Sequence, residues 1–197
     1  MIAYETITRN SGLTIEIHQD EDAGNPYEEC DQASHMITGH REYNYTTKGA
    51  TDYLTRDVDD YEGWNEIADE LRKNHRAEVL PVYAYIHGGI TIRTSSAYSD
   101  LFDSGLLGIV FMTAADIRET YMHKIATADA RSRSRDLMKG EIESLDDYLT
   151  GNVWGYVVKD ADGNDLDSCW GFVGDMEYCQ KEAEEAASYY EEKAEAA

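Results

Sequence analysis

The segment Leu80–Met112 holds the longest run of strand-forming residues in the chain, and much of it alternates between polar and apolar side chains. Residues 82–86 place Val, Ala and Ile on one side and two tyrosines on the other, which is the period of a strand with one buried face. The glycine pair at 88–89 allows a tight reversal, so residues 90–92 are predicted as the antiparallel partner. Residues 106–112 form a third apolar strand. Together these strands predict a central sheet.

Two more hairpins are predicted, one near each end of the chain. Residues 2–8 and 13–18 alternate in polarity and flank the turn sequence Asn-Ser-Gly. Residues 153–158 and 166–173 are rich in β-branched and aromatic side chains, and a turn containing Asp-Gly separates them.

Four stretches carry helical signals. Residues 61–74 repeat apolar side chains with the spacing i, i+3, i+4 and i+7 of an amphipathic helix. Thr113 is placed as an N-cap with Asp116 at the third helical position, which is the signature of a capping box. A further helical pattern covers residues 127–149, and the last one begins at Glu177.

The expected fold is therefore α+β. One domain over residues 1–176 would contain a central, mostly antiparallel sheet of about five to seven strands with three to four helices packed on it. An acidic helix over residues 177–197 would pack on that domain or extend from it.

The charge balance changes the picture, because 40 Asp and Glu stand against 17 Lys and Arg, a formal net charge of −23. Residues 19–70 alone hold 15 acidic side chains against three basic ones. Such a surface repels nucleic acids and anionic membranes and attracts basic protein surfaces. Three explanations stay open: solubility or adaptation to a salty cytoplasm, mimicry of a phosphate backbone, and metal binding by some carboxylates.

If the acidity serves mimicry, the partner is a basic surface of a host protein or nucleoprotein complex, with no direct binding to nucleic acid or membrane; a homodimer is left open. The candidate partner-binding residues are Asp20, Glu21, Asp22, Glu28, Glu29, Asp31, Asp52, Asp57, Asp59, Asp60, Glu62 and Glu66. The one basic patch, residues 124–139, is expected to pair with acidic segments within the chain or between subunits.

No cofactor or metal site is expected. Asp20, Asp22 and Asn25 resemble the start of a calcium loop, but the glycine and the terminal glutamate of an EF-hand are missing. The three cysteines include no CxxC pair, which favours a reducing compartment. The N-terminus lacks the pattern of a signal peptide, so we expect a cytosolic protein.

No phosphate-binding glycine loop, HExxH, GxSxG or dinucleotide fingerprint occurs, so non-catalytic roles are favoured over an enzyme. His40 is interpreted as a structural histidine beside Tyr43. If His87 and Asp103 met across the sheet edge, an imidazole oriented by a carboxylate could act as a general base for a nucleophile. The candidate residues for such a site are His87, Asp103, Asp167 and His40, with Ser104 or Cys169 as nucleophile.

Several short motifs occur in a defined order along about two-thirds of the chain. They are Asp20, Asp22, Pro26, Asp31, His40 and Tyr43; Leu80-Pro81 with Tyr83, Tyr85, His87, Gly89, Ile90 and Thr91; Asp103-Ser104-Gly105; Tyr148-Leu149-Thr150-Gly151 with Val153 and Gly155; and Asp167-Ser168-Cys169-Trp170-Gly171-Phe172. In these motifs the chain resembles a family of phage and mobile-element accessory proteins of about this length. It departs from many of them at Glu29-Cys30, where they carry a tryptophan.

The resemblance implies a small accessory protein that acts inside an infected bacterium. It favours inhibition of a host defence system of the restriction or CRISPR type, and the chain's charge is consistent with nucleic-acid mimicry. Two alternatives stay open. One is a small-ligand-binding protein or hydrolase with a site around His87 and Asp103. The other is a structural or regulatory phage protein whose acidity serves only solubility.

Overall fold

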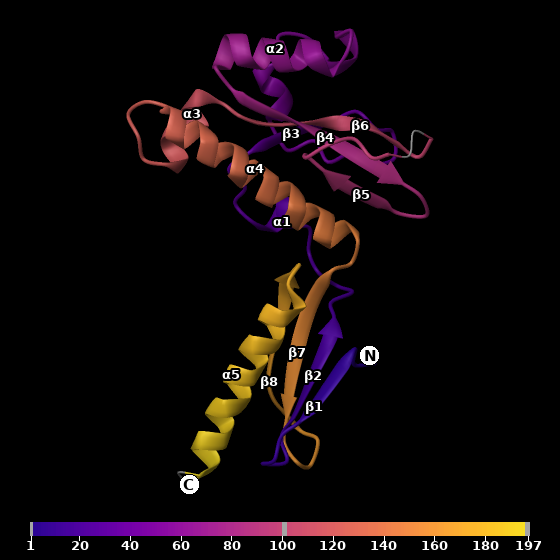
Figure 1. The fold of residues 1–197 in the computed structure, drawn as a ribbon, viewed down its shortest axis with the longest axis vertical. Coiled ribbons are helices and arrows are strands. Elements are labelled where there is room, and N and C mark those ends of the chain that lie inside the picture. The colour runs from indigo at the N-terminus through magenta and orange to yellow at the C-terminus, as the bar shows by residue number, and fades with distance from the viewer. Residues whose placement is uncertain (1, 100–101, 196–197) are drawn as a thin grey trace. The chain divides into compact units, whose positions relative to one another are not determined.

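A computed structural model describes residues 2–99 and 102–195 (Figure 1). The chain divides into two compact units. The first consists of Met1–Pro26 and Asp147–Ala197, and the second of Tyr27–Asp146. In the order of the chain, the second unit is therefore an insertion between the two halves of the first.

The first unit is a four-stranded antiparallel sheet with one helix. Its strands, in spatial order, are β1 (Glu5–Thr8), β2 (Thr14–Gln19), β7 (Val153–Lys159) and β8 (Asp165–Val173). The pairs β1–β2 and β7–β8 are the two hairpins expected near the chain ends, and both are confirmed. β2 pairs with β7, which joins the hairpins into one sheet. Helix α5 (Met176–Glu195) lies along this sheet (Figure 1).

Helix α5 packs on the sheet through small side chains. Its Cys179, Ala183 and Ala187 are fully buried in one cluster with two isoleucines of β2 and with Tyr156 and Val158 of β7. Of the two positions expected for the C-terminal helix, the structure thus shows the packed one. Burial raises the pKa of the Cys179 thiol to about 11, so this cysteine is a packing residue rather than a reactive thiolate.

The second unit has a four-stranded antiparallel sheet of its own. In spatial order its strands are β3 (His35–Thr38), β6 (Ser104–Met112), β4 (Glu78–Ile86) and β5 (Ile90–Arg93). Its helices are α1 (Pro26–Glu29), α2 (Trp64–His75), α3 (Ala114–Thr120) and α4 (Ala128–Leu149), with short 3₁₀ helices η1 (Ala50–Tyr53) and η2 (Val58–Asp60). The strands predicted within Leu80–Met112 are all present.

Helices cover both faces of this second sheet. Figure 1 shows α2 on one side and α4 on the other. Ile67 and Leu71 of α2 join a core with Ile37 and Phe111, while α4 buries Met138 and two further apolar residues further along its length. Because both faces are covered, residues 107–112 of β6 are all buried, which explains why this run is continuously apolar rather than alternating.

The α+β class is confirmed, but the strands form two sheets of four rather than one central sheet. Polarity patterns identify a strand and its buried face, whereas its partner depends on contacts distant in sequence. The patterns also missed β3 and α1, which are only four residues each. Helix α5 belongs to the first unit, and the expectation of a single domain over residues 1–176 stays a prediction.

Strands β3 and β6 approach each other closely at Gly108. Gly108 pairs with Thr38, and a Cβ atom at position 108 would overlap the carbonyl oxygen of Ile37 and lie 2.8 Å from the Cα atom of Thr38. Both atoms belong to the backbone and cannot rotate away. The pairing of these strands therefore requires glycine at this position.

Replacing Gly108 with alanine should lower the free energy of unfolding of the second unit by about 1–3 kcal/mol, because the strands must separate to admit the methyl group. Gly105→Ala is the matched control, since it changes the same strand where no atom lies within 4 Å of the added Cβ. Urea denaturation followed by circular dichroism measures both. Equal losses in the two variants would contradict the close approach.

Helix α3 begins with the predicted capping box. The Thr113 hydroxyl accepts hydrogen bonds from the N–H groups of Ala115 and Asp116, and Asp116 Oδ2 accepts one of 2.7 Å from the Thr113 N–H. His35 Nε2 lies 3.4 Å from the same oxygen. Burial alone would raise the pKa of Asp116, but the hydrogen bonds from His35 and Thr113 outweigh it and hold this pKa below its usual value.

Because its pKa is lower in the folded state, Asp116 stabilises the fold at neutral pH, and this contribution disappears as the pH falls through the folded-state pKa. Asp116→Asn should therefore cost about 1 kcal/mol of unfolding free energy at neutral pH and less at about pH 3. Glu119→Gln, an exposed change in the same helix, is the control. Denaturation curves at both pH values test this, and a pH-independent loss would contradict it.

Candidate functional site

His87 and Asp103 meet at one edge of the second sheet, as the sequence suggested they could. His87 Nδ1 lies 2.9 Å from Asp103 Oδ2. The turn between β4 and β5 holds the histidine, and its N–H donates to the carbonyl of Gly89. The Ile86 N–H donates to the carbonyl of Asp103 at 2.7 Å, which fixes the start of β6 beside this turn. The backbone thus positions both side chains.

The imidazole is open to solvent on its other side. The side chain of His87 is 72% exposed, against 39% for Asp103. Tyr85 stacks against the ring at a centroid distance of 6.2 Å, and Tyr98 packs on Tyr85 in turn. The aromatic ring and the carboxylate orient the imidazole, and its Nε2 atom remains accessible to an incoming molecule.

A pocket of 340 Å³ is lined by Asp103 of this pair, whereas His87 is not among its lining residues. It is lined by His40, Ala84, Ile86 and residues 102–107, so Asp103 and Ser104 face it together with His40. Most of the lining is apolar, and Phe102 at its rim is 99% exposed. An apolar hollow with a few polar groups is the usual form of a small-ligand site.

His40 itself has a structural role. Its Nδ1 atom accepts hydrogen bonds from the N–H groups of Glu42 and Tyr43, both at 3.2 Å, and its ring lies beside that of Tyr43. The expected hydrogen-bonded position of His40 beside Tyr43 is thus observed. Since Nδ1 accepts, the neutral ring carries its proton on Nε2 and can donate from there.

The other catalytic candidates lie in the first unit, on β8. Asp167 accepts a hydrogen bond from the N–H of Ser168, which satisfies a backbone group of its own strand, and Cys169 is exposed. Within the second unit, the hydroxyl that shares the pocket with Asp103 is that of Ser104. The pair of His87 and Asp103 is thus accompanied by a serine rather than by Cys169.

Ten of the twelve acidic candidates are exposed, and in the described part of the chain their side chains form no hydrogen bond or ion pair. They are Glu21, Asp22, Glu28, Glu29, Asp31, Asp52, Asp57, Asp59, Asp60 and Glu62. The other two are engaged within the chain: Asp20 accepts from the N–H groups of Asp22 and Gly171, and Glu66 pairs with Arg56. These two are structural.

The acidic segment is divided by the fold. Asp20–Asp22 belong to the first unit, and the remaining candidates belong to the second. Within the second unit, residues 28–31 include the end of α1 and lie on the α4 side of the sheet, because Ala33 and Ser34 hydrogen-bond to Glu141 of α4. Residues 52–62 lie on the α2 side, where Tyr53, Leu54, Val58 and Tyr61 join the core. Residues 52–62 are therefore the densest group that stays together.

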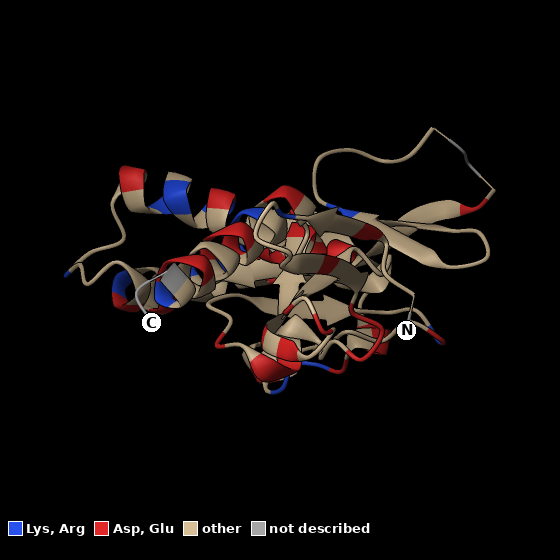
Figure 2. Cartoon of the chain, turned by 90° about the horizontal axis from the view of Figure 1, so that it is seen from below, with Lys and Arg blue, Asp and Glu red and all other residues tan. Residues whose placement is uncertain are grey.

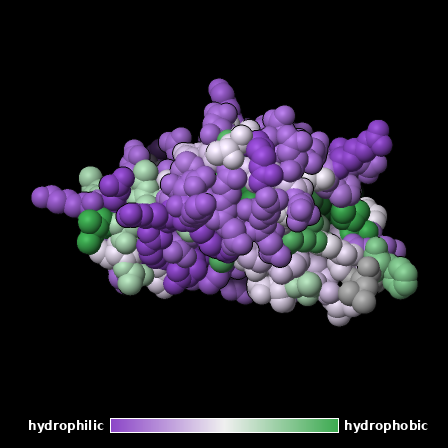
Figure 3. Space-filling model, turned by 90° about the horizontal axis from the view of Figure 1, so that it is seen from above, coloured by the Kyte–Doolittle hydropathy of each residue, from purple (hydrophilic) through white to green (hydrophobic). Residues whose placement is uncertain are grey.

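Acidic side chains also occur well beyond this segment (Figure 2). The first unit carries 18 Asp and Glu against 4 Lys and Arg, a net charge of −14 over 77 residues. The second carries 22 against 13, a net charge of −9 over 120 residues. Figure 3, which views the molecule from the α2 side, shows a mostly hydrophilic surface.

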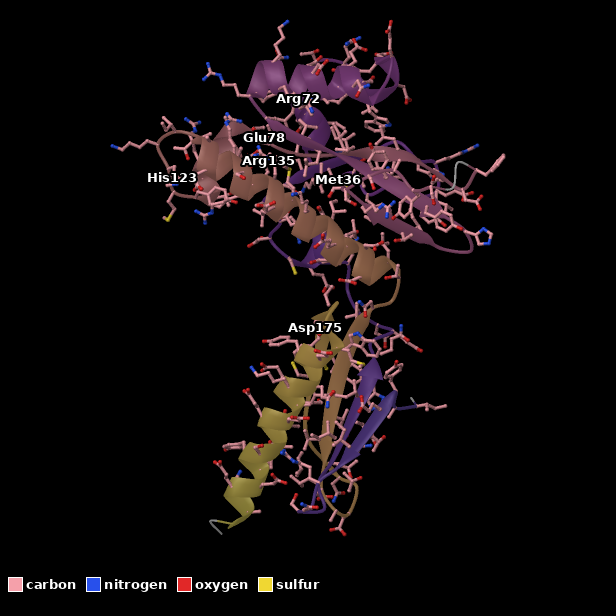
Figure 4. All side chains as sticks on the ribbon, viewed as in Figure 1. Met36, Arg72, Glu78, His123, Arg135 and Asp175 are labelled. Atoms are coloured by element: carbon pink, nitrogen blue, oxygen red, sulfur yellow. The ribbon has the colours of Figure 1, made fainter. Side chains whose placement is uncertain are left out.

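The basic patch was expected to pair with acidic segments either within the chain or between subunits, and two of its arginines pair within the chain. Arg131 and Arg135 of α4 lie 3.0 and 2.8 Å from the carboxylate of Glu78 on β4. Glu78 and Arg135 are labelled in Figure 4. Arg133 lies over the ring of Tyr121, 4.4 Å from its centroid. Intramolecular pairing is thus confirmed for two of the arginines.

In the motif that resembles the start of a calcium loop, Asp20 Oδ1 accepts a hydrogen bond from the N–H of Asp22. The turn between β7 and β8 has a similar spacing of acidic and amide side chains. Asp160 Oδ1 accepts from the N–H groups of Asp162 and Asn164, at 2.9 and 2.8 Å, which closes the β7–β8 turn. Across residues 2–99 and 102–195, no group of three or more His, Cys, Asp and Glu side chains is arranged to hold a metal ion.

One feature was missed by the sequence patterns: a pocket lined by several basic residues between the end of α2 and the start of α4. Its residues span positions 53–131 on separate elements, so no local spacing signalled them. The described helices include none that is both long and apolar enough to cross a membrane. In comparisons with known proteins, no family model, curated protein or solved structure matches this chain.

Proposed function

We propose that this chain is a phage-type accessory protein that binds and blocks a basic, nucleic-acid-binding surface of a bacterial host defence protein of the restriction or CRISPR type. Residues 52–62 are the proposed contact surface. The observation that carries the proposal is a group of five exposed carboxylates within eleven residues, none of which forms an ion pair within the described part of the chain: Asp52, Asp57, Asp59, Asp60 and Glu62.

The single basic residue of this stretch, Arg56, is exposed but paired within the chain. Arg56 donates to Glu66 at 2.6 Å and to the carbonyl of Asp60 at 3.2 Å, and its guanidinium lies 4.0 Å from the ring centroid of Tyr61. The hydrogen bond from Arg56, assisted by the Glu62 N–H, lowers the pKa of Glu66. Arg56 therefore stabilises this stretch through Glu66 and the backbone of Asp60. It does not neutralise the negative charge of the five exposed carboxylates.

The stretch is also held rigidly. Tyr61 is only 8% exposed, and Tyr53, Leu54 and Val58 pack against the same core. Thr55 donates from both its N–H and its hydroxyl to Glu70, at 2.8 and 2.9 Å. A surface that is ordered before binding loses less conformational entropy on association. Its carboxylates can accept charge-assisted hydrogen bonds from arginine and lysine side chains that would otherwise contact phosphates.

A second candidate function is supported by the pair of His87 and Asp103. A histidine oriented by a carboxylate, with a serine hydroxyl at the adjoining pocket, has the parts of a general-base site for hydrolysis. The pair is largely exposed, however, and solvent weakens such electrostatic assistance. We therefore place this function second.

Neutralising the contact surface should abolish partner binding. We expect the variant D57N/D59N/D60N/E62Q to lose capture of a basic nucleic-acid-binding protein from bacterial extract, and the wild-type complex to dissociate as salt rises, because the interaction is between charges. Affinity capture at low and high salt, with identification by mass spectrometry, measures this. Protection of phage plating in a host with the captured defence system tests the consequence.

The matched control is D162N/D165N/E177Q/E192Q, which changes the net charge equally at exposed residues of the first unit. It should retain the partner. If both quadruple variants bind the partner equally, only the net charge of the protein matters for binding. Residues 52–62 are then not the contact surface.

The second candidate function makes a separate prediction. If His87 is a general base, His87→Gln and Asp103→Asn should each lower hydrolysis of p-nitrophenyl esters by roughly 100-fold with little change in melting temperature. His123→Gln, at an exposed histidine outside the pocket, should have no effect (Figure 4). Equal rates in all three variants would show that His87 reacts only as an ordinary surface imidazole.

A further inference from the structure

The second unit contains a pocket whose charge is opposite to that of the chain as a whole. It has a volume of 440 Å³ and lies between the end of α2, the start of α3 and the first turn of α4. Its basic lining residues are His75, Arg76, Arg118, Lys124 and Arg131. No Asp or Glu lines it, although these residues outnumber Lys and Arg more than twofold in the sequence.

Two carboxylates on the elements beside this pocket, Glu78 and Asp116, are already engaged. Glu78 is shared by Arg131 and Arg135, at 3.0 and 2.8 Å. Asp116 is held by the Thr113 N–H and by His35 in the capping box of α3. Neither is available to neutralise the remaining cations.

Three cations of the lining have no ion pair in the part of the chain that the structure describes. They are Arg76, Arg118 and Lys124. Arg118 donates from Nε to the carbonyl of Ala114, which positions its guanidinium at the pocket, while its terminal nitrogens remain available. Three exposed cations that line one pocket without an ion-pair partner favour an anion, and the repulsion among them is relieved when an anion binds.

The backbone beside the pocket is strained in the same way at two places. Arg76 and Met122 have φ angles of 51° and 53°, and among the described residues they are the two outside glycine with positive φ. Arg76 ends α2 in the left-handed conformation, where glycine would be most favourable. Strain of this kind is retained where a side chain is needed at that position. Here the retained side chain is one of the three free cations.

The walls and size of the pocket indicate the ligand class. Tyr53 and Ile125 add an aromatic and an aliphatic surface, and 440 Å³ is in the range of small-molecule sites, about 300–1,000 Å³. Arginine side chains bind phosphate oxygens through two parallel hydrogen bonds. We propose that this pocket binds the oligophosphate group of a small ligand, such as pyrophosphate or a nucleoside triphosphate.

The net charge of the protein opposes the approach of such a ligand but does not prevent its binding. Solvent-exposed charges more than about 8–10 Å away are largely screened at physiological ionic strength. The guanidinium and ammonium groups that line the pocket act at hydrogen-bond distance instead. The pocket is therefore selective for a compact, highly charged anion over an extended one, which would also meet the acidic surface.

Isothermal titration calorimetry with pyrophosphate and with ATP tests the proposal on the full chain. Wild-type protein should bind at least one of them, and the variant Arg118→Gln/Lys124→Gln should lose about tenfold or more in affinity. The control is Lys48→Gln/Lys73→Gln, which removes the same charge at exposed lysines outside the pocket and should bind as wild type. Binding of ATP but not of pyrophosphate identifies the nucleotide as the source of the phosphates.

Arg76→Gly separates function from folding. Glycine relieves the left-handed strain and should raise the melting temperature by a few degrees, while the loss of the cation weakens binding. Four outcomes would overturn the proposal. They are no binding of either phosphate, equal losses in both double variants, equal affinity for citrate, and tighter binding of a short oligonucleotide than of ATP.

Discussion

The pairing of β2 with β7 is the constraint on which the rest of the chain depends. These two strands occupy the middle of the first sheet, so β1, β8 and α5 have nothing to pack on until they meet. The contact is extended by the Asp20 N–H, which donates to the carbonyl of Val153, and by the Gln19 side chain, which donates to that of Gly151. The chain between Gln19 and Gly151 is consequently a loop whose two ends are held together by this pairing.

The entropic cost of closing such a loop grows only slowly with its length. A long insertion is tolerated if it forms contacts of its own, and residues 27–146 form a compact unit. Their sheet has a separate core, with α2 on one face and α4 on the other. The two-part organisation therefore follows from one long-range strand pairing together with a compact insertion.

The surface has regions of opposite charge, which suit different ligands. Many basic side chains serve internal contacts, as Arg56 does with Glu66 and Lys159 does with Glu16, so exposed carboxylates are left without counter-charges. The exception is the pocket near Arg118, where cations rather than carboxylates lack an ion-pair partner among the described residues. The two regions adjoin at η1: Asp52 is exposed to solvent, whereas the next residue, Tyr53, lines the basic pocket. A protein acidic on average can thus present surfaces for both a basic partner and a small anion.

Features that depend on residues close in sequence were predictable. The capping box of Thr113 and Asp116 is one example. The meeting of His87 with Asp103 was raised only as a possibility, and it depends on the antiparallel pairing of β4 with β6, between which β5 lies in the chain. Strand β3 was missed because a run of four residues of mixed polarity carries no periodicity, and its place is decided by pairing with β6. Asp20 and Glu66 were expected to face a partner, but their hydrogen bonds to Gly171 and Arg56 become visible only in the folded chain.

By itself, the sequence determined the α+β class, the three hairpins, the positions of the longer helices and the excess of negative charge. These are properties of composition and of short-range periodicity, which act within a few residues. The tertiary structure alone decided that the strands form two sheets, that the acidic segment is divided between two units, and that five basic side chains from separate elements share one pocket. Such arrangements depend on which distant strands exchange hydrogen bonds, and the alternation of side chains along a single strand is the same for any partner.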